Sequence, residues 1–386
     1  MTADSGAAPR VAFYMHRVYN GGVERVWFNL AAELLARGVQ VDLVVNQVTA
    51  SPFMAQLPSG VRVIDLNSRR FVDRPFRLKG YLRRERPAAL LSALHFSNEF
   101  AVLAAAMARC GTRVVVTEHT TLSADLASVP RLHPRRWALR ALAALAYRHA
   151  DAVVAVSRGA ADDLAQLLKL PRERVDHIYN PVLNAAAQDK ALAPLDHPWF
   201  GDDGVPVILS VGRLEAAKDF ATLINAFAIV RRSRPCRLLI LGQGSLRGEL
   251  TRQVAAMGLT GDVELPGFVA NPYAFMARAS VFVVSSAWEG FCAVLVEALA
   301  LGTPVVSTDC ASGPAEILDG GRYGALVPIA QPALLAQALQ RSLDGERAST
   351  PPAGWLNRFT PAHAVERYAQ VLNVALAAPR SLEAGG

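Results

Sequence analysis

The chain has 386 residues, of which 52% are hydrophobic and 19% are charged, and its formal net charge is +7. This length exceeds what one hydrophobic core usually supports, so two domains are expected, and the apolar content argues against a disordered chain. The positive charge favours anionic partners, such as nucleotides, phosphates, nucleic acid or an acidic membrane face.

The sequence lacks the features expected of secreted proteins, of membrane-spanning proteins, and of proteins stabilised by disulfides or zinc. Its longest apolar runs, at 280–287 and 293–302, are too short to cross a bilayer as a helix. Residues 1–10 lack the apolar segment of a secretion signal, so a cytoplasmic protein is expected. The cysteines have no CxxC spacing, which predicts reduced thiols rather than disulfides or a zinc site; they are Cys110, Cys236, Cys292 and Cys310.

In the first half of the chain, short apolar runs alternate with segments of helical period. Such runs predict parallel strands covered on both faces; they are RVAFYMHR (10–17), VQVDLVV (39–45), VRVIDL (61–66), AALLSAL (88–94), RVVVTEH (113–119), DAVVAVS (151–157) and HIYNP (177–181). After the first run, one helical stripe is formed by Val26, Trp27, Leu30, Ala31, Leu34 and Leu35. Gly38 is expected to end that helix.

A second series of the same kind follows a polar, proline-containing segment at 180–204, which we interpret as an interdomain linker. The runs of the second series are VPVILSVGRL (205–214), RLLILGQG (237–244), VELPGF (263–268), SVFVVSSA (280–287), TPVVSTD (303–309) and GALVPIA (324–330). The prediction is two doubly wound α/β domains, at 10–185 and 195–360, with a cleft between them. A last amphipathic helix is predicted at 361–378.

Several residues lie where open parallel sheets bind ligands, beyond the carboxyl ends of the strands. Gly21 and Gly22 suit either an anion-binding turn or a tight turn that requires positive φ, and the sequence does not separate these readings. Arg213 and Lys218 suit phosphate, or form a solvated surface pair. The run GQGSLRG (242–248) departs by one residue from a dinucleotide fingerprint, which disfavours a nicotinamide site.

His119 ends a predicted strand beside Glu118 and two threonines, which favours a functional role over that of a core histidine. In SGPAEIL (312–318), Ser312 is the candidate N-cap of a short helix that carries Glu316 near its positive end. A helix N-terminus of this kind is also a phosphate site if it lines a cleft.

Two carboxylates, Glu289 and Glu297, stand in the apolar stretch SSAWEGFCAVLVEALALGTPVV (285–306). A buried carboxylate without a partner is costly, so something must satisfy each of them. Vicinal hydroxyls of a sugar or a ribose are suitable partners, because a carboxylate accepts two hydrogen bonds side by side. The alternative is that Glu297 reaches solvent and Glu289 caps the following helix.

Taken together, these motifs resemble those of the retaining family-4 glycosyltransferases (glycosyl transferases group 1) of the GT-B fold, which has two Rossmann-like domains. The similarity covers most of the chain, in the family's order and spacing. It is carried by GGVERVWFNLAAEL (21–34), TEHT (117–120), ADAVVAVSRGAADDL (150–164), HIYNPV (177–182), SVGRLEAAKDF (210–220), GQGSLRGEL (242–250), VELPGFV (263–269), EGFCAVLVEALALGTPVVST (289–308) and SGPAEIL (312–318).

The resemblance implies an acceptor-binding first domain, a second domain that binds a nucleotide sugar, and a last helix that packs back on the first. Arg213 and Lys218 would neutralise the donor diphosphate, Glu297 would hold the ribose, and Glu289 would hold the transferred sugar. His119 would contact that sugar, and Val269 lies in the stretch that meets the nucleobase. The remaining donor-site residues implied are Gly21, Gly22, Gly242, Phe291, Cys292, Ala293 and Val294.

The implied activity is a hexosyltransferase that needs no cofactor besides its donor. The chain has no D-x-D motif, so we expect metal-independent catalysis, with retention of configuration through front-face attack. The segment STDCASGPAEIL (307–318) is similar to that of members using UDP-N-acetylhexosamines. A sugar-nucleotide epimerase of the same fold is the nearest alternative, and a nucleic-acid-binding protein is a more distant one.

Two basic segments in the first half, at 69–87 and 131–149, interleave arginine with aromatic and aliphatic residues. This pattern suits an anionic membrane surface, and an ordinary solvated helix face is the alternative. With the membrane interpretation, the acceptor is lipid-linked, and the protein works at the inner face of the cell membrane. A soluble saccharide acceptor is the other expectation.

Overall fold

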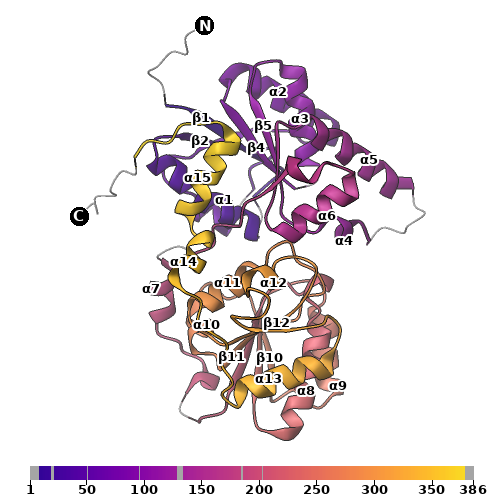
Figure 1. Cartoon of the computed structure of the whole chain (residues 1–386), viewed down its shortest axis with the longest axis vertical. Coiled ribbons are helices and arrows are strands. Elements are labelled where there is room, and N and C mark those ends of the chain that lie inside the picture. The colour runs from indigo at the N-terminus through magenta and orange to yellow at the C-terminus, as the bar shows by residue number, and fades with distance from the viewer. Residues whose placement is uncertain are drawn as a thin grey trace. The chain divides into compact units, whose positions relative to one another are not determined.

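The computed structural model describes residues 8–18, 21–49, 51–94, 96–127, 134–183, 186–201 and 203–378. The chain forms two compact units (Figure 1). Met1–Val182 and Arg358–Gly386 make up the first unit, and Leu183–Asn357 makes up the second. No helix among the described residues is long and apolar enough to cross a membrane.

The first unit contains a parallel sheet with the strand order β3-β2-β1-β4-β5-β6-β7. Its strands are β1 (Arg10–Met15), β2 (Gln40–Val45), β3 (Arg62–Asp65), β4 (Ala89–Ala93), β5 (Arg113–Glu118), β6 (Ala152–Ala155) and β7 (Val175–His177). The chain leaves β1 toward one edge of the sheet and returns at β4 toward the other. This topological switch point therefore lies between β1 and β4.

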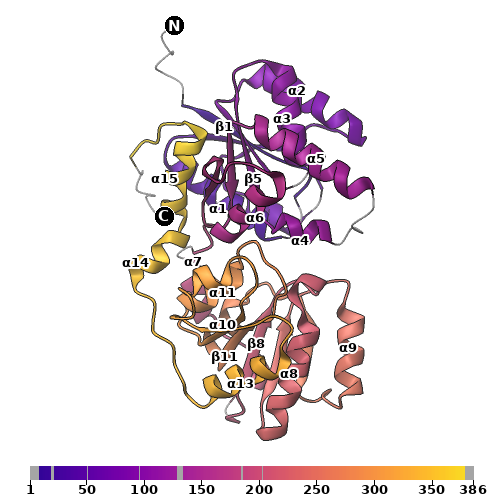
Figure 2. The ribbon, with the colours of Figure 1, turned by 45° about the vertical axis from the view of Figure 1, so that its right-hand side comes forward.

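Helices cover both faces of the first sheet. On one face α1 (Gly22–Ala36) packs against α15 (Pro361–Leu372). The other face carries α2 (Arg74–Glu85), α3 (Ser97–Ala108), α5 (Pro134–His149) and α6 (Arg158–Leu168), and α4 (Leu122–Ala127) packs on α6. Figure 2 shows α2, α3 and α5 along one side of this unit. Alternate strand residues such as Ala12 and Tyr14 join the core beneath these helices, as buried parallel strands require.

The second unit repeats this architecture with the strand order β10-β9-β8-β11-β12-β13. Its strands are β8 (Val207–Val211), β9 (Arg237–Leu241), β10 (Val263–Gly267), β11 (Val281–Val284), β12 (Val305–Thr308) and β13 (Ala325–Val327). Its helices are α7 (Ala186–Leu192), α8 (Phe220–Ser233), α9 (Arg247–Ala256), α10 (Tyr273–Arg278), α11 (Ala293–Ala300), α12 (Pro314–Ile317), α13 (Pro332–Leu343) and α14 (Ala353–Leu356). The switch point lies between β8 and β11. The predicted fold class, two doubly wound Rossmann-like domains, is therefore confirmed.

The helical stripe predicted after the first strand is buried in α1, apart from the half-buried Leu35. Gly38 follows the helix with a φ of +78°, and the Val39 amide donates to the Leu34 carbonyl at 2.9 Å. This closes the helix in the way that a glycine after the last turn allows.

Three local expectations differ from the structure. The last strand of the first sheet is Val175–His177, so the predicted strand 177–181 begins where that strand ends. The segment 180–204 is more than a linker, because α7 lies within it and packs on α10, where Arg278 donates to the Ala191 carbonyl. Helix α15 ends at Leu372 and not near 378, because Asn373 adopts a left-handed conformation.

Candidate active site

In the second unit, the predicted cationic loop and the first of the two glutamates follow adjacent strands at the switch point. Arg213 and Lys218 follow β8, and Glu289 follows β11, which pairs with β8 in parallel. The loops are joined by a hydrogen bond from the Ala287 amide to the Ala217 carbonyl at 2.8 Å. Ser285 Oγ also donates to the Lys218 carbonyl at 2.7 Å. The fold therefore gathers these residues where open sheets bind ligands.

Lys218 and Glu289 form an ion pair whose side chains are 19% and 10% exposed. Ser286 Oγ donates a further hydrogen bond to Glu289 Oε1 at 2.6 Å. Burial alone would lower the pKa of Lys218, but the neighbouring Glu289 carboxylate outweighs it and raises the pKa above its ordinary value. Lys218 is therefore a fixed cation.

Arg213 differs from Lys218 because its side chain is exposed. Its positive charge slightly opposes protonation of Lys218, so the two cations lie close enough to interact. The loop beyond it is held by Glu215, which accepts hydrogen bonds from the amide and the hydroxyl of Ser245 at 3.1 and 2.9 Å. The exposed Arg213 side chain therefore lies on a loop that the Glu215–Ser245 hydrogen bonds hold in place.

Two glycines allow the loops of this site to approach each other closely. A Cβ atom on Gly242 (φ +143°) would lie 1.8 Å from the Gly212 carbonyl oxygen, so any other residue would push the β9 and β8 loops apart. Gly313 (φ +94°) packs in the same way on the Phe291 carbonyl, 2.2 Å from the Cβ position. Gly313, and not Ser312, is the N-cap residue of α12.

The segment 291–294, predicted to lie near the donor, connects the loop after β11 to the start of α11. Phe291 and Cys292 are buried, and Ala293 and Val294 begin α11 with half-buried side chains. Cys292 is the N-cap residue of α11 in a left-handed conformation, with a φ of 72°. Burial, reinforced by the Glu289 charge, raises the pKa of its thiol well above the ordinary value. The thiol is therefore neutral, so it is unsuited to act as a nucleophile.

Glu297 lies on α11 with 1% of its surface exposed, so it does not reach solvent. The Tyr273 hydroxyl on α10 donates a hydrogen bond to Glu297 Oε1 at 3.0 Å. No sequence pattern pointed to Tyr273, which lies 24 positions away from Glu297. Val269 follows β10 at the edge of the sheet, and β9 and β8 separate that strand from β11.

In the first unit, Gly21 and Gly22 begin α1 after β1, beside the other switch point. Gly21 has a φ of −123°, so the reading as a turn that requires positive φ is wrong. A Cβ atom on Gly21 would lie 2.8 Å from Glu24 Oε2, while one on Gly22 would meet nothing within 4 Å. A side chain at position 21 would therefore require the Glu24 carboxylate to shift.

His119 follows β5, also at the carboxyl edge of the first sheet. Its side chain is 9% exposed, and Nε2 lies 3.1 Å from Thr117 Oγ1. Burial lowers the pKa of His119 to about 4, so the imidazole is neutral at physiological pH. A neutral imidazole can contact a sugar but carries no charge to offset that of a phosphate.

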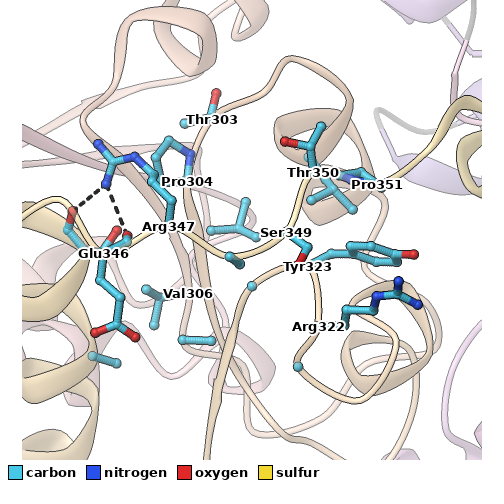
Figure 3. A pocket seen from close by; sticks show the side chains of 18 of the residues that line it. Thr303, Pro304, Val306, Arg322, Tyr323, Glu346, Arg347, Ser349, Thr350 and Pro351 are labelled. Atoms are coloured by element: carbon cyan, nitrogen blue, oxygen red, sulfur yellow. Dashed lines mark hydrogen bonds between the residues drawn. The ribbon is translucent and has the colours of Figure 1, made fainter.

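A cavity of about 430 Å³ in the second unit lies away from all of these residues. Figure 3 shows Thr303, Pro304 and Tyr323 around it, with Arg347 and Ser349 on the segment after α13. Thr303 and Tyr323 precede β12 and β13, so this cavity lies at the amino ends of strands whose carboxyl ends face the predicted site. Among the described residues, no group of three or more His, Cys, Asp or Glu side chains could hold a metal ion.

Comparison with known proteins gives matches over most of the chain. Residues 20–183 match the model of "Glycosyltransferase Family 4", and residues 205–345 match "Glycosyl transferases group 1". An N-acetylgalactosaminyltransferase of Campylobacter jejuni, which acts on a diphospho-undecaprenol-linked acceptor, is 31% identical over 280 residues. That match covers 72% of this chain and 74% of the relative.

A second relative and a solved structure extend this similarity. The lipopolysaccharide core biosynthesis glycosyltransferase LpsE of Rhizobium meliloti is 27% identical over 335 residues, which cover 85% of this chain and 87% of that protein. The crystal structure of Anabaena HepE with UDP and glucose superimposes with a TM-score of 0.76 at 21% identity. It covers 94% of this chain and 99% of its own, which supports the fold.

Proposed function

The chain belongs to the family-4 glycosyltransferases, and we propose that it moves a sugar from a UDP-sugar to a lipid-linked or saccharide acceptor with retention of configuration. The observation that carries this proposal is the Lys218–Glu289 pair beside Arg213 at the switch point of the second sheet. The names of two relatives support it, since one uses an undecaprenol-linked acceptor and the other acts in lipopolysaccharide core synthesis. A UDP-N-acetylhexosamine is the donor we favour.

In this proposal the donor binds to both members of the Lys218–Glu289 pair. The Lys218 ammonium has three N–H donors, so it can keep Glu289 while it also binds a phosphate oxygen. Glu289 then accepts hydrogen bonds from hydroxyls of the transferred sugar. Glu297 holds the ribose, because a carboxylate accepts hydrogen bonds from the vicinal hydroxyls of a sugar.

The reaction breaks the bond between the sugar's anomeric carbon and the diphosphate oxygen. The acceptor hydroxyl forms its new bond on the same face, through an oxocarbenium-like state, and its proton passes to the departing phosphate. Negative charge builds on that phosphate, and Arg213 and Lys218 oppose it without having to reorganise. These two side chains supply the positive charge that a divalent metal would otherwise supply, so we propose that catalysis is metal-independent.

The rival activities predict different products. A sugar-nucleotide epimerase would convert its substrate without an acceptor, and the relatives named above are transferases. A nucleic-acid-binding protein would require neither Glu289 nor Glu297.

The donor class can be tested by thermal-shift measurements with a panel of UDP-, GDP- and ADP-sugars. A ligand at about 100 times its Kd stabilises the folded protein by about 2.7 kcal/mol, so the true donor should raise Tm clearly. We expect only UDP-sugars to do so. Transfer is then measured with a radiolabelled donor sugar and a polyprenyl-diphosphate-linked sugar as acceptor. The labelled product is extracted into organic solvent. Stabilisation by GDP-sugars alone would contradict the UDP assignment, and loss of the label to water alone would contradict transfer.

The first unit carries an apolar surface that suits membrane contact. Phe76 on α2 and Trp137 on α5 each expose 61% of their surface. Helix α3 packs between α2 and α5 and exposes Leu103 to 48%. The other large apolar side chains exposed on or beside these helices are Phe71, Val72, Leu94, Leu142 and Leu145. Scattered single apolar residues are normal on a surface, but a cluster over three neighbouring helices marks an interaction site.

Exposed basic side chains lie on the same helices, in the basic segment 69–87 and in α5. Arg70 and Arg77 are exposed and form no ion pair with an acidic residue among those that the structure describes. Other exposed basic residues nearby are Arg69, Arg83, Arg84, Arg86 and Arg148. Residues 131–133 of the second basic segment lie outside the described residues. Apolar insertion flanked by positive charge suits an anionic lipid surface, so we propose that α2, α3 and α5 contact the cytoplasmic membrane.

Membrane contact is tested by sedimentation with vesicles that contain one third phosphatidylglycerol, and with neutral vesicles. Each basic residue near the surface contributes about 1 kcal/mol, so Arg70→Gln with Arg77→Gln should weaken binding to the anionic vesicles by about 2 kcal/mol. Trp137→Ser should weaken it as well. Leu192→Ser is the matched control, since Leu192 is 80% exposed and belongs to the second unit. Equal binding to neutral vesicles would refute the electrostatic part of the proposal.

A further inference from the structure

Behind His119 lies a buried set of polar side chains to which the proposed reaction assigns no role. We propose that Tyr147 is a positioning residue: through Glu118 it fixes the loop after β5, so that His119 presents Nδ1 as a hydrogen-bond acceptor to a sugar hydroxyl. This rests on the proposed function, because His119 must meet a sugar for the positioning to matter. All the contacts that support it lie within the first unit.

Tyr147 reaches the loop through a buried carboxylate. Its hydroxyl, on the inner face of α5, donates to Glu118 Oε2 at 2.9 Å. The other oxygen, Oε1, accepts from the His119 backbone amide at 3.1 Å. Tyr147 and Glu118 are each 1% exposed. One carboxylate therefore links a helix to the first residue after β5.

Asn98 on α3 completes this link from the other side. Its Nδ2 donates to the Tyr147 hydroxyl at 2.7 Å and to the Thr117 carbonyl at 3.0 Å. The Tyr147 oxygen thus accepts one hydrogen bond and donates another, so its proton is directed to Glu118. Burial, followed by the nearby charges of Glu118 and Glu99, raises the pKa of Tyr147 well above its ordinary value, which keeps that proton in place.

The same contacts determine which nitrogen of His119 carries the proton. Thr117 has one hydroxyl proton, and it donates this proton to the Ser92 carbonyl oxygen at 2.8 Å, because a carbonyl can only accept. Thr117 Oγ1 must then accept from His119 Nε2, which lies 3.1 Å away. Nε2 therefore carries the proton, and Nδ1 is left with a lone pair.

His119 Nδ1 is buried, and it has no hydrogen-bond partner among the described residues. An acceptor atom in this state costs free energy unless a donor reaches it. A hydroxyl group of a sugar is such a donor, whereas a phosphate oxygen is not. The network therefore favours a sugar hydroxyl as the partner of His119. A shift of the loop after β5 would move Nδ1 away from that hydroxyl.

The test compares Tyr147→Phe with a matched control, Tyr81→Phe. Tyr81 is also a buried tyrosine of the first unit whose hydroxyl donates to a buried carboxylate, Asp42 Oδ2, at 2.6 Å. Asp42 lies near the amino end of β2, and the His119 loop is at the carboxyl edge of the sheet. Both variants remove one hydroxyl group, so a loss of stability alone should be similar in the two.

We expect Tyr147→Phe to lower kcat about 10- to 100-fold, since a small misplacement of a contacting group has effects of that size. The Kd for free UDP should be unchanged, and Tyr81→Phe should retain its kcat. In a His119→Ala background, Tyr147→Phe should change kcat by no more than about two-fold, because the two residues act as one unit. Additive losses in the double variant, or equal losses in Tyr147→Phe and Tyr81→Phe, would overturn the proposal.

A readout without activity separates this proposal from the proposed function. Long-range ¹H–¹⁵N NMR of histidine-labelled protein reports which imidazole nitrogen carries the proton. We expect protonated Nε2 and unprotonated Nδ1 for His119, assigned through its loss in His119→Ala. In Tyr147→Phe, the backbone amide signal of His119 should shift or broaden, and in Tyr81→Phe it should not. A protonated Nδ1 in the wild-type protein would refute the inference even if transferase activity is found.

Discussion

Replacing each of the two cations in the second unit should separate their effect on catalysis from their effect on folding. Lys218 is paired with Glu289, and both side chains are largely buried. Breaking a fully buried pair by removing one partner destabilises a protein by about 3–5 kcal/mol. Because this pair is partly exposed, and Ser286 still donates to Glu289, we expect Lys218→Ala to cost about 1–3 kcal/mol. Arg213 is exposed, so Arg213→Ala should change stability by about 0.5 kcal/mol or less.

Both substitutions should nevertheless reduce catalysis to a similar degree. Each removes a fixed positive charge from the departing diphosphate, and losing one such group typically lowers kcat about 10²–10³-fold. The double variant should lose less than the product of the two single losses, because both charges act on one diphosphate. Steady-state kinetics gives kcat, and urea unfolding followed by circular dichroism gives stability.

The variant Lys218→Met with Glu289→Gln provides the control. It removes both charges while it keeps similar side-chain volumes, so it should recover much of the stability lost in Lys218→Ala and none of the activity. Near-normal kcat in both Arg213→Ala and Lys218→Ala would refute the role of the two cations. Equal loss of stability in these two variants would refute the argument from burial.

Three further predictions concern Glu297, His119 and the metal requirement. Glu297→Gln should weaken UDP binding by about 1.5–3 kcal/mol in calorimetry, since a hydrogen bond to a charged group contributes about that much, and unchanged affinity would contradict the ribose assignment. Burial lowers the pKa of His119 from 6.5 to about 4, so the unfolded chain binds its proton more readily. Stability should therefore fall by up to about 3 kcal/mol as pH drops from 6.5 toward 4, and this part should be absent in His119→Gln. Transfer activity should survive excess EDTA, and a loss that Mn²⁺ restores would contradict charge stabilisation by Arg213 and Lys218 alone.

The sequence predicted the sheets well because buried parallel strands leave a local signal. Runs such as VILSV and VFVV are continuous, apolar and bounded by glycine, proline or polar residues, so each marks a strand without reference to its neighbours. The errors occurred where the local signal is weak. Helix α15 was extended past Leu372, since an asparagine in left-handed conformation is not visible in composition, and α7 was missed because it spans only seven residues.

The partners of the two glutamates show why a site is harder to predict than a strand. The sequence implied that Glu289 and Glu297 need partners, but the ones found are Lys218, 71 positions away, and Tyr273, 24 positions away. Lys218 is predicted to bind phosphate together with Arg213, and the structure pairs it with Glu289. The Lys218–Glu289 pair depends on strand order, because β8 and β11 are neighbours in the sheet although β9 and β10 lie between them in the sequence. No pattern within one segment carries that information.

The kind of partner that each glutamate has determines how it can respond to a ligand. The Lys218 ammonium already has the Glu289 carboxylate as its partner, so it is not an uncompensated buried charge. When the donor binds, Lys218 can contact a phosphate oxygen and Glu289 at the same time. The Tyr273 hydroxyl donates one hydrogen bond to Glu297, and ribose hydroxyls would donate further hydrogen bonds to the same side chain. The cationic pair should therefore govern the rate of transfer, and Glu297 should govern the affinity for the nucleoside, which is why the two sets of substitutions should differ in kcat and in Kd.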